Sequence, residues 1–257
     1  MSRLEHDADV YADADAVELL AGQRSAPLFL TCEHASQRLP DGWQWPEHDR
    51  RLLGTHWAFD LGARELTLEL AHALGASAVL SRFSRLLVDP NRDELHDDLF
   101  RALADGEPVL LNVGLEEDER ERRIAGYHRP YHAAVDAALE AVAAPLLLSI
   151  HSFTPVYQGE PRTVELGVLF NQDEEAAHML GSALSREFAN VAYNEPWSGR
   201  LGLIYAAERH AARHGRLALE LEVRQDLASD PRYRAALVKV LAKLFREWRF
   251  SARSSAG

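Results

Sequence analysis

The sequence predicts an α/β fold in which helices flank a mostly parallel sheet, and three observations support this class. Short apolar runs alternate with longer segments whose apolar residues recur every three or four positions. Several runs are apolar at consecutive positions, which is typical of strands buried on both faces. The 257 residues contain no internal repeat and no linker-like stretch, so we expect a single domain spanning residues 1–257.

The expected elements alternate between strand and helix along the chain. Strands are predicted at Leu28–Thr31, Ala78–Leu80, Leu86–Val88, Leu146–Ile150, Val164–Phe170 and Leu217–Val223. Helices are predicted at Trp57–Leu74, about Glu116–Val142, Asp173–Phe188, Leu203–His214 and Pro231–Trp248. Gly75 is suited to end the first helix, and Asp230 followed by Pro231 is suited to begin the last one. The core is expected at about 26–250, with frayed ends at 1–22 and 251–257.

Composition excludes several classes of partner. The net charge of −12 disfavours nucleic acid and anionic membranes, because both are polyanionic. The acidic N-terminus does not resemble a signal peptide, and no apolar run approaches the length of a membrane span. The one cysteine, Cys32, rules out an internal disulfide and a zinc site built on several thiolates, and it fits a cytoplasmic location.

Polar residues directly follow four of the apolar runs. In an open parallel sheet, ligands bind beyond the carboxyl ends of the strands, so these residues are the first candidates for function. They lie in the segments Cys32-Glu33-His34, Asp89-Pro90-Asn91-Arg92, His151-Ser152-Phe153 and Glu220-Leu221-Glu222-Val223-Arg224.

Two of these segments carry candidate metal ligands. A catalytic zinc site takes three ligands from His, Asp and Glu and leaves one position for water. His34 and His151 are candidates, although a histidine at a strand end often has a purely structural role. Asp60 is the preferred third ligand, with His56 as an alternative or as a supporting partner. A spacing of four puts His56 and Asp60 on one face of the expected helix. The same spacing is typical of an ordinary pair on a helix surface.

Hydrolysis by a metal-bound water also needs a general base. Glu222 is the leading candidate and Glu220 the alternative, because residues two apart on one strand face the same side. One of them could instead pair with Arg224, two positions further along that side. A buried glutamate without a metal or an arginine would be costly.

Arginines are the candidates for binding an anionic substrate, because the planar guanidinium matches a carboxylate. The candidates are Arg82, Arg85, Arg92, Arg129 and Arg224. Arg92 is best placed, directly after an apolar run, and Asn91 beside it adds a neutral donor and acceptor. This pair suits a substrate with both a carboxylate and an amide.

Other routes to chemistry have little support in the sequence. No glycine-rich phosphate loop follows a strand, and no serine lies in a Gly-x-Ser-x-Gly elbow. Cys32 precedes Glu33 and His34, but a cysteine in a strand is more often a small buried apolar residue than a nucleophile.

Six blocks in series resemble the N-formylglutamate amidohydrolase family, in its less characterised branch, from about Leu28 to Leu227. They are Cys32-Glu33-His34-Ala35-Ser36 with Leu39-Pro40, His56-Trp57-Ala58-Phe59-Asp60-Leu61-Gly62-Ala63, Ser84-Arg85-Leu86-Leu87-Val88-Asp89-Pro90-Asn91-Arg92, Tyr127-His128-Arg129-Pro130-Tyr131-His132, Ser149-Ile150-His151-Ser152-Phe153-Thr154-Pro155 and Glu222-Val223-Arg224-Gln225-Asp226-Leu227.

The resemblance implies a phosphorylase/hydrolase-like α/β fold, related to zinc carboxypeptidases, and hydrolysis of N-formyl-L-glutamate to formate and glutamate. It implies a metal held by His34, Asp60 and His151, with Glu222 as base. It places Asn91-Arg92, Arg224 and, more loosely, Arg129 at the substrate.

The sequence therefore predicts a zinc-dependent amidohydrolase acting on a small anionic N-formyl or N-acyl amino acid. A related N-acyl-amino-acid deacylase or a carboxypeptidase-like peptidase would keep the same site. A non-catalytic protein that binds an amino-acid derivative is the alternative of another class. The oligomeric state is not predictable from the sequence.

Overall fold

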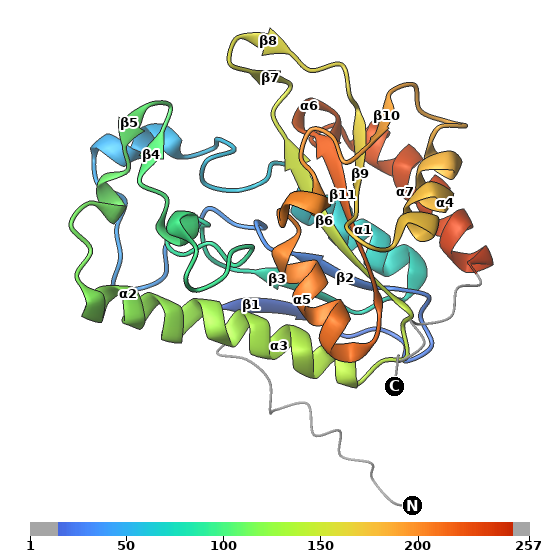
Figure 1. Cartoon of the computed structure of the whole chain (residues 1–257), viewed down its shortest axis with the longest axis horizontal. Coiled ribbons are helices and arrows are strands. Elements are labelled where there is room, and N and C mark those ends of the chain that lie inside the picture. Colours follow the sequence, from blue (N-terminus) through green and yellow to red (C-terminus); the bar gives the residue numbers. More distant parts are fainter. Residues whose placement is uncertain (1–14, 249–257) are drawn as a thin grey trace, which may run out of the picture.

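The computed structural model describes residues 15–248, in which a seven-stranded sheet is flanked by helices (Figure 1). The strand order is β1-β3-β2-β6-β11-β9-β10. Four neighbouring pairs are parallel, whereas β1 with β3 and β11 with β9 are antiparallel. The mostly parallel α/β class predicted from the sequence is confirmed.

The sheet strands are β1 (Val17–Leu20), β2 (Phe29–Cys32), β3 (Ala78–Ser81), β6 (Leu146–Phe153), β9 (Leu166–Leu169), β10 (Val191–Tyr193) and β11 (Leu217–Arg224). The helices are α1 (Ala63–Leu74), α2 (Glu117–Arg123), α3 (Arg129–Glu140), α4 (Glu174–Leu184), α5 (Tyr205–His214), α6 (Gln225–Ala228) and α7 (Pro231–Glu247). Two small hairpins, β4–β5 (Leu103–Ala104, Glu107–Pro108) and β7–β8 (Val156–Tyr157, Glu160–Pro161), lie outside the sheet. None of the described helices is long and apolar enough to span a membrane.

Two apolar cores lie on opposite faces of the sheet. On one face, α1, α4 and α7 pack against alternate residues of β6 and β11, such as Leu148 and Leu219. On the other, α3 and α5 pack against Leu147 and Ala218. Because side chains alternate along a strand, the residues in step with Leu147 and Ala218 further along β6 and β11 also face the α3–α5 side. Those residues are His151 on β6 and Glu222 on β11, and this alternation positions the site.

Several sequence expectations about single elements hold. The predicted helix at about Glu116–Val142 is found as α2, a π-helical turn at Ile124–His128, and α3. The carboxyl cap at Gly75 is left-handed, with φ of 62°. The Asp230 side chain accepts a hydrogen bond from the Arg232 amide and so caps α7. These local signals act within one turn, where tertiary context has least influence.

The strand expected at Leu86–Val88 is wrong, because this segment forms a buried turn. The amides of Leu86 and Leu87 bond to the side-chain and backbone oxygens of Ser84, at 3.2 and 2.9 Å. All three apolar side chains are nevertheless fully buried. Burial therefore produced the apolar run without a strand.

The start of the expected core and the start of the first predicted helix differ from the prediction. Residues 17–20, expected to be frayed, form β1 and pair antiparallel with β3. The predicted helix Trp57–Leu74 begins only at Ala63, because Gly62 is left-handed with φ of 79°. The predicted tail 251–257 lies outside the described residues.

Candidate metal-dependent active site

The candidate site lies at the carboxyl ends of the central parallel strands β2, β6 and β11. His34 follows β2, His151 lies within β6, and Glu222 on β11 stands directly opposite His151 in the strand register. All three side chains are buried. The strand-end rule therefore brings together residues that are far apart in the sequence.

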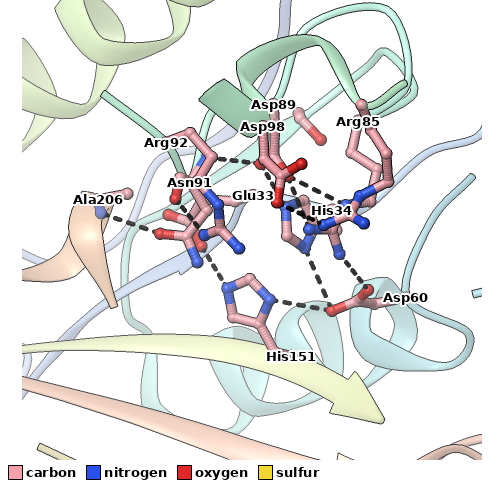
Figure 2. Close-up of polar contacts among 12 residues, drawn as sticks. Glu33, His34, Asp60, Arg85, Asp89, Asn91, Arg92, Asp98, His151 and Ala206 are labelled. Carbon is pink, nitrogen blue, oxygen red and sulfur yellow. Dashed lines mark hydrogen bonds and ion pairs between the residues drawn. The ribbon is translucent and has the colours of Figure 1, made fainter. Parts of the chain in front are cut away.

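Asp60 lies between the two histidines, as Figure 2 shows. Its Oδ2 atom is 2.9 Å from His151 Nδ1 and 3.5 Å from His34 Nδ1. One ligand atom from each of the three residues lies within 4.8 Å of the others. The structure thus brings together the three ligands that the sequence predicts, in a group that could hold a metal ion.

The backbone around Asp60 fixes its carboxylate in this place. The Asp60 amide donates to the His34 carbonyl at 2.9 Å, and the Ser152 amide donates to Asp60 Oδ2 at 3.1 Å. Two positions on, a Cβ on Gly62 would lie 2.3 Å from the Ala228 carbonyl oxygen, so only glycine fits there. The loop that carries Asp60 is therefore tied to β2, β6 and α6 rather than being part of a helix.

The remaining nitrogen of each imidazole faces a second carboxylate. His34 Nε2 is 2.8 Å from Asp89 Oδ1, and His151 Nε2 is 3.0 Å from Glu33 Oε2. Glu33 in turn accepts hydrogen bonds from the Tyr131 and Ser149 hydroxyls. A carboxylate on the far nitrogen orients a ligating imidazole and fixes its tautomer, and this arrangement is common in metal sites.

The electrostatics of the site reflect a surplus of buried acid. Burial opposes charging of His151, but Glu220, Asp60 and Glu33 raise its pKa well above its usual range. Burial would also raise the pKa of Glu33, yet its bonds from His151, Ser149 and Tyr131 lower it to about 2. Burial is the main reason why the pKa of Glu220 rises to about 7, and burial together with Glu220 raises the pKa of Glu222 well above normal.

Among the buried polar atoms of the cavity-lining residues that make no hydrogen bond within the described chain, three could ligate a cation. They are His34 Nδ1, Glu220 Oε2 and Glu222 Oε2. Such atoms are rare in folded proteins, because each one costs its full desolvation energy. Their side chains line the same cavity, and an imidazole nitrogen and carboxylate oxygens are atoms that can coordinate a cation.

The cavity has a volume of about 360 Å³, which suits a small amino-acid derivative. Beyond the metal group and the two glutamates, its walls include arginines, aromatic residues and His56. His56 contacts the Trp57 ring at 4.6 Å between centroids and is not part of the metal group. The expectation that His56 and Asp60 share a helix face is wrong, because both precede α1.

Among the predicted substrate-binding residues, Arg85, Asn91 and Arg92 line the cavity. Arg85 is bound to Asp89 at 2.7 Å, and its Nη1 lies 3.7 Å from Asp60. The Asn91 amide group donates to the Leu203 carbonyl and accepts from the Ala206 amide, which ties the Asn91-Arg92 segment to the start of α5.

The structure does not bring Arg129 and Arg224 to the cavity. Arg129 pairs with Glu94 and Glu121 on the exposed side of α3, and Arg224 pairs with Asp226. Arg224 follows Glu222 by two residues, but its side chain also donates to the Arg162 carbonyl. Each arginine forms an ion pair with acids outside the cavity. The spacing of residues in the sequence does not predict these pairs.

Sequence reasoning missed four residues of the site. Glu33 and Asp89 orient the histidines, and Arg101 and Arg162 line the cavity. The signal for the two acids was their position beside His34 and Asn91-Arg92 in strand-end segments. No comparable signal marks Arg101 and Arg162, which reach the cavity from loops. Cys32 is fully buried, and burial raises the pKa of its thiol, so a nucleophilic role is disfavoured.

The sequence profile of the N-formylglutamate amidohydrolase family matches residues 26–229. The chain belongs to this family. All the residues of the metal group lie inside the matched segment.

The chain is also similar to individual proteins and solved structures. The chain is 31% identical over 147 residues to an N-formylglutamate deformylase from Pseudomonas putida, a match that spans 51% of this chain and only 53% of that protein. A gene product from Agrobacterium tumefaciens has a solved structure with a TM-score of 0.83 at 28% identity, covering 92% of this chain and 96% of the other. An N-formylglutamate amidohydrolase from Ralstonia eutropha has a similar fold, with a TM-score of 0.62 at 22% identity over 91% and 96% of the two chains.

Proposed function

We propose that the protein is a metal-dependent amidohydrolase that cleaves the amide bond of a small anionic N-acyl amino acid, with N-formyl-L-glutamate as the first candidate. The observation that carries this proposal is the buried group of His34, Asp60 and His151 beside two buried glutamates in one cavity. Membership of the N-formylglutamate amidohydrolase family supports the choice of bond and substrate.

His34 and His151 would hold the metal through their Nδ1 atoms, with Asp60 as third ligand. This assignment follows from the contacts, because both Nδ1 atoms face Asp60 while both Nε2 atoms are held by other carboxylates. A set of two imidazoles and one carboxylate is typical of catalytic zinc. Such an ion polarises an amide carbonyl and lowers the pKa of a bound water to about 7.

Glu222 is the proposed general base, with Glu220 as the alternative. In this role the Glu222 carboxylate accepts a proton from the attacking water and returns it to the departing amine. This role is supported by its register opposite His151 of the candidate metal group and by its buried Oε2, which makes no hydrogen bond in the described chain. Glu220 lies one strand period earlier and approaches His151 Nε2 at 3.4 Å.

Arg92 is the proposed partner of a substrate carboxylate. Its Nη1 donates to the Asn91 carbonyl at 2.7 Å, which orients the guanidinium, while its buried Nε makes no hydrogen bond within the described chain. Asn91 would act by positioning this segment. Arg85 would act indirectly, since its pairing with Asp89 keeps the acid that orients His34 ionised.

One experiment tests this proposal. Protein purified without added zinc is assayed for bound metal, and amine release is measured with formyl, acetyl and succinyl amino acids. We expect about one divalent ion per chain and preference for an N-formyl dicarboxylic amino acid. Glu222→Gln should keep the metal and lose about 10²- to 10⁴-fold in kcat, as expected for loss of a general base.

The possible outcomes separate the alternatives. Preference for larger acyl groups or peptides would identify a deacylase or a peptidase instead. Ligand binding without any amine release would indicate a non-catalytic binding protein. Wild-type turnover in Glu222→Gln, together with its loss in Glu220→Gln, would move the base to Glu220.

A further inference from the structure

Four arginines line the cavity, and they differ in how their charge is balanced. Arg85 is paired with Asp89 at 2.7 Å, and Arg101 is paired with Asp98 at 3.1 Å. No carboxylate of residues 15–248 lies within ion-pair distance of Arg92 or of Arg162. The cavity therefore contains two guanidinium groups whose charge is available to a ligand.

Arg162 is held at the mouth of the cavity by aromatic side chains. Its guanidinium carbon lies 4.6 Å from the centre of the Tyr157 ring, 5.0 Å from that of Trp197 and 5.5 Å from that of Phe153. One nitrogen, Nη1, donates to the carbonyl and hydroxyl oxygens of Thr154. Within the described chain, Nε and Nη2 make no hydrogen bond, which leaves one edge of the planar group for an anion.

The aromatic residues around Arg162 come from the end of β6, which carries Phe153, and from two further segments. Tyr157 belongs to the β7–β8 hairpin, which projects beyond the end of β6 in Figure 1. Trp197 belongs to the loop after β10, which Asn194 anchors by accepting bonds from the Phe170 and Gly199 amides. The two rings meet edge to face at 5.9 Å. The guanidinium is thus oriented before any ligand binds, which lowers the entropy cost of binding.

We propose that Arg162 binds one carboxylate of the substrate while Arg92 binds the other, so that the site selects N-acyl amino acids with two carboxylates. The inference rests on the proposed function, in which the amide bond to be cleaved lies at the candidate metal group. It deepens that function by naming a second specificity-determining residue.

The charge environment gives a physical reason for such selection. The same cavity is lined by Asp60, Glu220 and Glu222, so its guanidinium groups are the favourable partners for a substrate carboxylate. Burial lowers the pKa of Arg162, whereas the nearby Glu222 carboxylate raises it. Replacing a substrate carboxylate by an amide would leave one guanidinium uncompensated, and this costs binding.

The test compares N-formyl-L-glutamate with its two monoamides, N-formyl-L-glutamine and N-formyl-L-isoglutamine, by formate release. In Arg162→Ala, KM for the dicarboxylate should rise about ten- to a hundredfold, with kcat changed less than about threefold. KM for one of the two monoamides should hardly change, because that compound already lacks the carboxylate that Arg162 binds. Arg162→Lys should fall between the wild type and Arg162→Ala.

Arg200→Ala is the matched control. Arg200 also lies over an aromatic ring, that of Phe170 at 5.2 Å, but it pairs with Glu174 and does not line the cavity. It should leave all three KM values within about twofold of wild type. An equal KM rise for all three substrates in Arg162→Ala, or no rise for the dicarboxylate, would overturn the inference.

A binding measurement separates this inference from the proposed reaction. Calorimetric titration of N-formyl-L-glutamate into Glu222→Gln protein needs no turnover, and adding Arg162→Ala should weaken binding by the same ten- to hundredfold. If the wild type releases no formate while this binding difference persists, only the proposed reaction fails. If the dicarboxylate does not bind, or binds equally in both proteins, the role of Arg162 is refuted.

Discussion

Two groups of histidines lie in the interior of this molecule, and their surroundings differ. In the candidate metal group, His34 has two carboxylates within 3.5 Å and His151 has three. A second group, here called the helix-interface histidines, lies between α3 and α5 and consists of His132, His210 and His214. Among the described residues, the carboxylate that contacts this group is Asp136. Burial lowers the pKa of His132 and His210, whereas acid neighbours raise that of His151.

The difference shows that the local balance of acid, and not burial, decides what a buried histidine does. At the helix interface, Asp136 accepts from His210 Nδ1 at 2.7 Å, so a neutral His210 has Nε2 as an acceptor for His132 Nδ1 at 2.8 Å. These bonds join the two helices, although His132 Nε2 makes no hydrogen bond within the described chain. In the candidate metal group and around it the acids outnumber the imidazoles, an arrangement that could hold a cation.

Removing one ring from each group gives the largest expected contrast. His151→Ala should lose the metal and more than about a hundredfold in kcat/KM, because loss of a partner that merely supports a ligand already costs 10- to 100-fold. His210→Ala should keep full metal content and lose stability instead, since it leaves Asp136 and His132 without their buried partner. Elemental analysis, formate release and urea unfolding measure the three quantities.

The contrast fails in two recognisable ways. Retained metal and turnover in His151→Ala would remove that residue from the site. Metal loss in a folded His210→Ala protein would show that the helix-interface histidines also support the metal.

A smaller effect is expected from the acid that orients His34. Asp89→Asn keeps the shape of the side chain but removes the charge facing His34 Nε2 and Arg85. Metal affinity should fall about 10- to 100-fold, as measured by competition with a chelator. Asp98→Asn is a suitable control, because Asp98 also lines the cavity and pairs with an arginine but contacts neither histidine. Equal metal affinity in Asp89→Asn and wild type would contradict the orienting role.

Much of the fold was predictable because its signals are local. Consecutive apolar residues identified β2, β3, β6, β9 and β11, and capping residues placed the ends of α1 and α7. The edge strand β1 was missed because Val17–Leu20 is only partly buried. It also contains Glu18, which pairs with Arg64 and interrupts the apolar run. Leu86–Val88 was misassigned because a buried turn and a buried strand have the same composition.

His34 and His151 of the candidate metal group were predictable because parallel strands bring their carboxyl ends together. Each of these histidines lies at the end of an apolar run in the sequence. The substrate side was less predictable. Arg129 and Arg224 have suitable neighbours in sequence, yet each turns to acids outside the cavity. Arg162 reaches the cavity through a hairpin whose direction depends on contacts with Tyr157 and Trp197. Loop residues of this kind depend on tertiary packing that no short motif encodes.

The smallest effect concerns Asp136, which contacts His210 and His214 and also pairs with Arg213. Burial opposes ionisation of this group, but hydrogen bonds from His210 and His214 lower its pKa to about 2. A carboxyl whose pKa is depressed on folding stabilises the protein above its unfolded pKa of about 3.9, and the contribution is lost as the pH falls towards 2. Asp136→Asn should therefore lower the free energy of unfolding by about 2 kcal/mol at pH 7 and lose this difference near pH 2. Urea unfolding from pH 7 to pH 2 tests this, with the exposed Asp41→Asn as control. A pH-independent difference would show that Asp136 acts through packing and not through its charge. We also expect Asp136→Asn to keep the metal content of the wild type, because Asp136 contacts neither His34 nor His151.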